Sequence, residues 1–212
     1  MILTQRQKDF LNRYTIGVWK INPLNDLVDI EGNFHYGNFN REVKSPLRGI
    51  KFGEVTGDFY FEAQPSSFDD LSGFPYKVGK DFSCSRCSLN SLKGGPKEVG
   101  GNYYCSFNRG LKNFKYAPEI INGDFIARFN SGLESFEGLP KYIRGDLNLE
   151  DGHPWQSEVD TNNIIIVYKS EIGGSIKFDG EYRGGIEAIK SLAVPGISIR
   201  NILGVMSKRG II

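Results

Sequence analysis

The chain has 212 residues and a formal net charge of +1, with 39% hydrophobic and 24% charged residues. These values are ordinary for a globular domain, and they provide no overall electrostatic attraction to nucleic acid or to an anionic membrane. The sequence shows neither a secretory signal nor an apolar stretch of membrane-spanning length, so we expect a cytoplasmic protein that does not bind membranes.

The N-terminal region predicts a helix. Residues 3–14 have the spacing of an amphipathic helix, with Thr4 as a candidate N-cap and Phe10 and Leu11 on the apolar side. A stack of repeats needs a cover at each end, because the terminal repeat would otherwise leave half of its interior in water. We therefore predict an N-terminal helical cap over residues 1–27.

Residues 28–150 repeat one pattern. In the clearest copy, residues 99–118, an alternating apolar run through Val99 and Tyr103 is typical of a half-buried strand, and a segment that ends at Pro118 turns the chain back. Because one such unit cannot bury its own apolar side, we expect the units to stack with their strands parallel. The openings of the regular copies are roughly 21 to 23 residues apart, within the range of leucine-rich repeats: Val55, Val78, Val99, Ile121 and Ile143.

The pattern breaks after the repeats. Residues 151–182 predict an insertion that carries Trp155, followed by one last strand. Residues 183–212 predict two short helices separated by Pro195. We expect these helices to form a C-terminal cap, with an interaction surface as the alternative.

The repeated unit resembles the leucine-rich repeat. Its pattern, L-x-x-L-x-L-x-x-(N or C)-x-L, is met by Val99, Tyr103, Cys105, Asn108 and Leu111. The motifs G-D-F-x-C and S-L-x-G-x-P are similar to those of repeat proteins of large tailed bacteriophages. The opening, a helix followed by Trp19, Asn22 and the run VDIEG, is similar to these proteins as well. The resemblance covers residues 15–150.

The resemblance implies both a fold and a function. The implied fold is an α+β repeat solenoid, with a leucine-rich-repeat-like parallel β-sheet and helical N- and C-terminal caps. The implied function is non-enzymatic protein binding, by a phage protein that inhibits a host defence or transcription protein in the host cytoplasm through steric occlusion. The alternative is a virion structural or assembly accessory protein.

The cysteines invite a metal interpretation. Cys84 and Cys87 form a C-x-x-C motif, but zinc would need a fourth ligand, and both His35 and His153 are poorly placed to supply it. Cys84 and Cys105 share an inward strand position, and Cys87 stands where the repeat accepts Asn or Cys. We therefore predict buried, reduced thiols and no metal or cofactor, with a metal site or a redox pair as alternatives.

The repeat also assigns a role to two asparagines. Asn108 and Asn130 stand where the chain leaves the strand, and their amides are expected to bond the free backbone groups there as a ladder. No nucleophile lies beside a base in the repeat register, so we expect no enzymatic activity.

The outward positions of the strands form columns, and we define the Asx column as Asn33, Asp58, Asp81, Asn102, Asp124 and Asp146. In one interpretation, Asp or Asn after Gly is turn chemistry that caps the strand entry locally. In the other, the column forms a docking face for another protein, steered by charge and anchored by Tyr60 and Tyr104. Lysines lie mostly in the return segments, so nucleic acid binding is the weaker alternative. The candidate partner-binding residues are Asp58, Tyr60, Glu62, Asp81, Asn102, Tyr104, Asp124, Arg128, Asp146 and Trp155.

Overall fold

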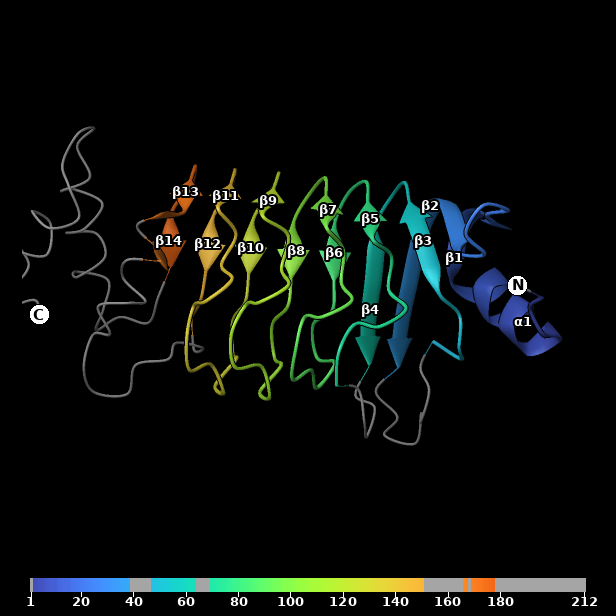
Figure 1. The fold of residues 1–212 in the computed structure, drawn as a ribbon, viewed down its shortest axis with the longest axis horizontal. Coiled ribbons are helices and arrows are strands. Elements are labelled where there is room, and N and C mark those ends of the chain that lie inside the picture. The colour runs from blue at the N-terminus through green and yellow to red at the C-terminus, as the bar shows by residue number, and fades with distance from the viewer. Residues whose placement is uncertain (1, 39–46, 64–68, 151–165, 168, 178–212) are drawn as a thin grey trace, which may run out of the picture.

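The protein is a parallel β-solenoid whose turns, here called rungs, stack along one long axis (Figure 1). This is a computed structural model, and it describes residues 2–38, 47–63, 69–150, 166–167 and 169–177. The expected parallel stacking of the repeats is confirmed. Trp155 and the expected C-terminal helices at 183–212 lie outside the described residues.

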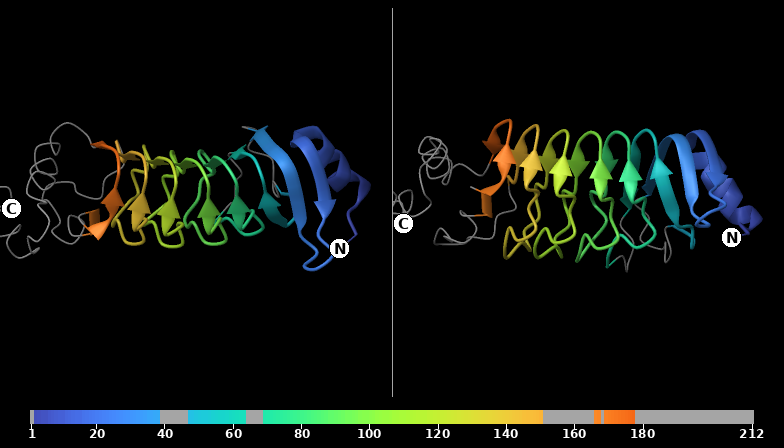
Figure 2. Two further views of the ribbon diagram at one scale, coloured as in Figure 1. Left: turned by 90° about the horizontal axis from the view of Figure 1, so that it is seen from above. Right: turned by 45° about the horizontal axis from the view of Figure 1, so that its top comes forward.

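Each rung contributes two short strands, which hydrogen bonds between rungs join into two parallel ladders (Figures 1 and 2). The long strand β2 (Val28–Asn38) belongs to both ladders. The first ladder continues from it through β3 (Phe52–Val55), β5 (Lys77–Val78), β7 (Glu98–Val99), β9 (Ile120–Ile121), β11 (Tyr142–Ile143) and β13 (Glu171–Ile172). The second ladder continues through β4 (Phe59–Ala63), β6 (Phe82–Ser83), β8 (Tyr103–Tyr104), β10 (Phe125–Ile126), β12 (Leu147–Asn148) and β14 (Ile176–Lys177).

The chain bends between the two strands of each rung. The sequence predicts one alternating strand over the first part of each repeat, V-x-G-D-F-x-C. In the structure, however, β5 ends at Val78 and β6 begins only at Phe82. The backbones pack so closely at this bend that a Cβ on Gly79 would collide with the backbone oxygen of Thr56. The single predicted strand is therefore wrong, and the solenoid has two outer faces, one on each ladder.

The interior is a continuous apolar core, as the repeat predicts. Phe34, Phe59 and Phe82 are fully buried, and their rings stack from rung to rung at 5.0 and 6.0 Å between centroids. The return segments face these rings with buried side chains such as Phe74, whose ring centroid lies 5.4 Å from that of Phe59 and 6.1 Å from that of Phe82. Fully burying one such side chain stabilises the fold by about 2 kcal/mol. Since each rung shares its core with its neighbours, the stack is the stable unit.

The N-terminal end carries the predicted helix. Helix α1 (Gln5–Tyr14) begins at a capping box, in which Gln7 N donates to Thr4 Oγ1 at 3.3 Å and Thr4 N donates to Gln7 Oε1 at 2.8 Å. The ring of Phe10 packs against Phe34 and Tyr36 of β2, with centroids 5.8 and 5.3 Å away.

A strand follows this helix. Strand β1 (Thr15–Ile21) pairs antiparallel with β2, so helix occupies only part of the range 1–27 expected to form a helical cap. In β1, the side chains of Ile16 and Val18 remain exposed.

None of the helices in the described ranges is long and apolar enough to cross a membrane.

Candidate functional site

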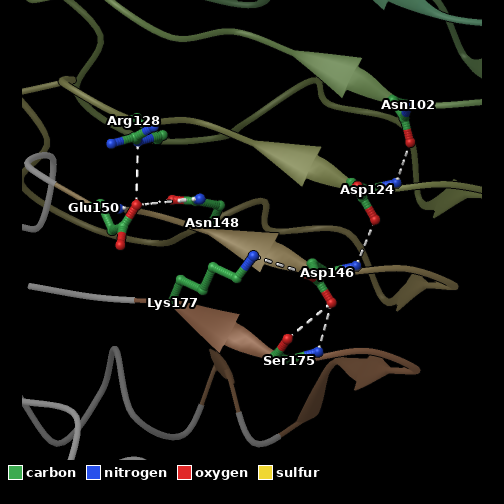
Figure 3. Close-up of polar contacts among 8 residues, drawn as sticks. All are labelled: Asn102, Asp124, Arg128, Asp146, Asn148, Glu150, Ser175 and Lys177. Atoms are coloured by element: carbon green, nitrogen blue, oxygen red, sulfur yellow. Dashed lines mark hydrogen bonds and ion pairs between the residues drawn. The ribbon is translucent and has the colours of Figure 1, made fainter.

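The outer face of the second ladder holds the Asx column. Each Oδ1 of the column accepts a hydrogen bond from the backbone N–H of the equivalent residue in the next rung, and Figure 3 shows these bonds for Asn102, Asp124 and Asp146. The N–H groups of Asp124, Asp146 and Ser175 donate to Asn102, Asp124 and Asp146, each at 2.7 Å. The earlier members make the same bonds at 2.8 to 3.1 Å. The column therefore satisfies backbone donors that the bend would leave without a partner.

The glycine that precedes most column residues makes room for this ladder. A Cβ at Gly123 would collide with Oδ1 of Asn102, and one at Gly145 would collide with Oδ1 of Asp124. The Gly-Asx pair thus repeats because the side chain of one rung fills the space above the glycine of the next. The column therefore serves the backbone, but its hydrogen bonds run between rungs, whereas the turn interpretation expected local capping of the strand entry.

Two tyrosines close over the middle of this face. Tyr60 and Tyr104 come from the rungs on either side of Ser83, and their rings meet edge to face with centroids 6.4 Å apart. Ser83 beneath them is only 3% exposed. Tyr60 Oη donates to Asp81 Oδ2 at 3.1 Å, and Asn102 Nδ2 donates to Tyr104 Oη at 3.0 Å. Both rings are therefore held in one orientation.

The aromatic surface extends toward the N-terminal end. His35 stacks on Tyr60 with centroids 4.9 Å apart and 27° between the ring planes. Burial raises the pKa of Tyr60 well above its usual value, and the neighbouring Asp81 carboxylate raises it further. The Tyr60 hydroxyl consequently stays protonated, and remains a donor to Asp81, at alkaline pH as well as at neutral pH.

Another outward column, formed by Gly37, Glu62, Ser85, Ser106, Arg128 and Glu150, is less exposed at its serines than the sequence suggests. Ser85 and Ser106 are only 8% and 7% exposed. Ser106 N donates to Ser85 Oγ at 3.1 Å, and Arg128 N donates to Ser106 Oγ at 3.1 Å. These hydroxyls form another rung-to-rung ladder, so the small side chains serve the backbone and are not free for a partner.

Charge is distributed unevenly along the face. At the C-terminal end, Arg128 pairs with Glu150 at 3.2 Å and Lys177 pairs with Asp146 at 3.1 Å (Figure 3). Nearer the N-terminal end, Asp58, Glu62 and Asp81 form no ion pair within the described ranges, and all three are half-buried. The net negative charge therefore lies beside the tyrosines.

The interior asparagine ladder is confirmed. Asn108 is fully buried, and its Oδ1 accepts from the N–H groups of Cys87 and Leu89, both at 3.1 Å. Its Nδ2 donates to the carbonyl oxygens of Cys84 at 3.1 Å and Cys105 at 3.0 Å. Asn130 repeats these donations one rung later, and its Oδ1 accepts from Asn108 N at 2.7 Å.

The three cysteines are buried free thiols, as predicted. Cys87 Sγ donates to the Phe61 carbonyl oxygen at 3.2 Å. In the following rungs, the equivalent hydrogen bond is donated by an asparagine Nδ2. Burial raises the pKa of Cys87 to about 12, and it also raises the pKa values of Cys84 and Cys105. Among the described residues, no three His, Cys, Asp or Glu side chains form a group that could hold a metal ion.

The structure thus brings nine of the ten sequence-predicted binding residues onto one ladder face, whereas Trp155 lies outside the described residues. Sequence reasoning missed how Tyr60 and Tyr104 close over Ser83, although the available signal was that a small residue, Ser83, stands at the repeat position that Tyr60 and Tyr104 occupy in the neighbouring rungs. No protein-family model, curated protein or solved structure matches the chain.

Proposed function

We propose that this chain is a non-enzymatic binding protein whose second-ladder face occupies a surface of another protein. The observation that carries the proposal is the closure of Tyr60 and Tyr104 over Ser83, with Asp81 and Asn102 fixing their hydroxyl groups. Tyrosines are frequent anchors of protein interfaces, and a surface that is ordered before binding loses little conformational entropy on association.

The charge of the face favours a basic partner surface. Asp58, Glu62 and Asp81 lie beside the two tyrosines, and this arrangement repels a nucleic-acid backbone while it attracts lysine and arginine side chains. A rigid solenoid that covers such a surface would inhibit its partner by occlusion, without a cofactor.

The resemblance to leucine-rich repeats of large tailed bacteriophages extends this proposal to the kind of partner. On that basis, the partner is a host defence or transcription protein, and the chain acts in the host cytoplasm. The alternative, a virion structural or assembly accessory protein, predicts capture of phage structural proteins or of further copies of the chain.

The test is affinity capture from host lysate, with and without infection, by the tagged protein and two variants. The first variant combines Tyr60→Ser with Tyr104→Ser. It removes both rings and leaves serine at positions 60, 83 and 104. Asp58→Asn, Asp81→Asn and Asp124→Asn together remove charge but keep the acceptor oxygen for each backbone N–H, since Asn already serves at Asn33 and Asn102. A single host protein that wild type retains and both variants lose would support the proposal.

The matched control neutralises carboxylates elsewhere, with Asp9→Asn, Asp69→Asn and Glu134→Gln, and should capture that host protein as well as wild type does. Capture that persists in both second-ladder variants would overturn the assignment to this face. Capture of phage structural proteins alone would favour the alternative function.

A further inference from the structure

The outer face of the first ladder carries a groove that the proposed function does not use. It has a volume of about 1250 Å³ and extends over the rungs of β5, β7, β9 and β11. Gly79 and Gly100 line it without side chains, whereas Tyr116 and Ile120 expose 52% and 55% of their surfaces. The groove therefore combines open space with exposed apolar surface.

Tyr116 stands where the neighbouring rungs have glycine. Gly73, Gly94 and Gly138 occupy the equivalent corner with φ of 92°, 83° and 84°, and Tyr116 adopts φ 74° at that corner. A left-handed backbone is unfavourable for a residue with a Cβ, and a Cβ at Gly94 or Gly138 would also crowd the backbone of the preceding rung. Tyr116 therefore occupies this corner at a conformational cost that the glycines of the neighbouring rungs avoid.

The charges of the groove identify the chemistry of a ligand. Three lysines are neutralised by ion pairs, because Lys77, Lys115 and Lys141 lie 3.3, 2.9 and 2.8 Å from Glu98, Glu137 and Glu119. Lys97 has no carboxylate partner within the described ranges, and its Nζ lies 6.0 Å from the centre of the Tyr116 ring. The groove thus offers one uncompensated cation beside an exposed aromatic ring.

We infer that this groove binds a short segment of a partner protein that places a carboxylate on Lys97 and an apolar or aromatic side chain on Tyr116 and Ile120. Single-stranded nucleic acid would also use lysines and aromatic rings. However, three of the four lysines that line the groove are already paired with glutamates, so the groove offers one free cation and not the row of cations that successive phosphates need. A peptide with a single carboxylate at this point fits the charges better.

The test pans the full-length protein against a displayed library of random short peptides, with Tyr116→Gly and Lys97→Glu panned in parallel. Wild type should enrich peptides with Asp or Glu beside an aromatic or aliphatic residue. Tyr116→Gly should weaken their binding about tenfold or more, measured by fluorescence anisotropy. Lys97→Glu should exchange the acidic preference for a basic one, whereas Lys93→Glu, on the same rung but outside the groove, should change nothing.

A second readout separates binding from folding. Because glycine relieves the left-handed strain, Tyr116→Gly should raise the melting temperature, by about 2 °C. A lower melting temperature with unchanged peptide binding would make Tyr116 a structural residue and overturn the inference. So would a wild-type selection without an acidic motif, or tight binding of an oligo-dT probe that is lost as salt rises. Since the variants lie on the first ladder, none of these outcomes depends on the second-ladder proposal.

Discussion

The two outer faces of the solenoid share one backbone geometry but use their side chains differently. On the second ladder, side-chain oxygens such as those of Asp124 and Ser106 are acceptors for the backbone of the next rung. On the first ladder, side chains such as Lys141 and Glu119 pair with each other, and Tyr116 faces an open groove. A column of uniform residue type therefore indicates backbone support, and departures from it indicate positions that can serve a partner.

The largest effect is expected where a buried side chain makes hydrogen bonds to the backbone of neighbouring rungs. Asn108→Ala would leave two buried N–H groups and two carbonyl oxygens with fewer partners, and should lower the free energy of unfolding by about 3 kcal/mol or more. Urea denaturation measures this change. Asn90→Ala, which removes an exposed asparagine bonded to Asp69, should have a far smaller effect. Equal losses would contradict the role of the interior ladder.

The next effect tests the space that the Asx column needs. Gly145→Ala would force a Cβ into Oδ1 of Asp124 and should lower the free energy of unfolding by about 2 kcal/mol. Gly37→Ala is the matched control, because a Cβ at Gly37 would meet no atom within 4 Å. If both variants unfold at the same denaturant concentration, the Gly-Asx pair has another origin.

The sequence predicted the stack, its core and the asparagine ladder, because each depends on residue types that recur at one spacing. It did not predict the bend between Val78 and Phe82, since inward residues four apart fit either one alternating strand or two short strands. It left the Asx column between local turn chemistry and a docking face, because an outward Asp or Asn side chain can serve either the backbone or a partner. The groove depends on Tyr116, which stands where the neighbouring rungs have glycine. The sequence alone does not show that this position is a left-handed corner, so it does not single out Tyr116.

A smaller effect should appear at acidic pH. The Ser175 N–H, and then Lys177, hold the pKa of Asp146 below its usual value. The folded state therefore binds its proton less tightly than the unfolded state, and Asp146 stabilises the fold above pH about 4, a contribution lost as pH falls through the folded pKa. Between about pH 5 and pH 2, the melting temperature should fall more for wild type than for Asp146→Asn. Parallel curves would contradict this contribution.

The smallest effect is expected on the first ladder. Lys141 and Glu119 are 74% and 73% exposed, so their ion pair is screened by water. Lys141→Ala, Glu119→Ala and the double variant should each change the melting temperature by less than about 1 °C. A coupling between them as large as the effect of Gly145→Ala would show that this face also supports the backbone.

The most direct test of the account compares two triple variants at Asp58, Asp81 and Asp124 by urea denaturation. Asn at all three positions keeps the Oδ1 acceptor of each backbone N–H and gives up only the part-buried side-chain contacts of Asp81 Oδ2, so the free energy of unfolding should fall by less than about 1 kcal/mol. Ala at all three positions removes the acceptors for the N–H groups of Asp81, Asn102 and Asp146, and should lower it by about 3 kcal/mol. Equal losses in the two variants would show that charge, and not the acceptor oxygen, is what the column contributes, and would contradict the account.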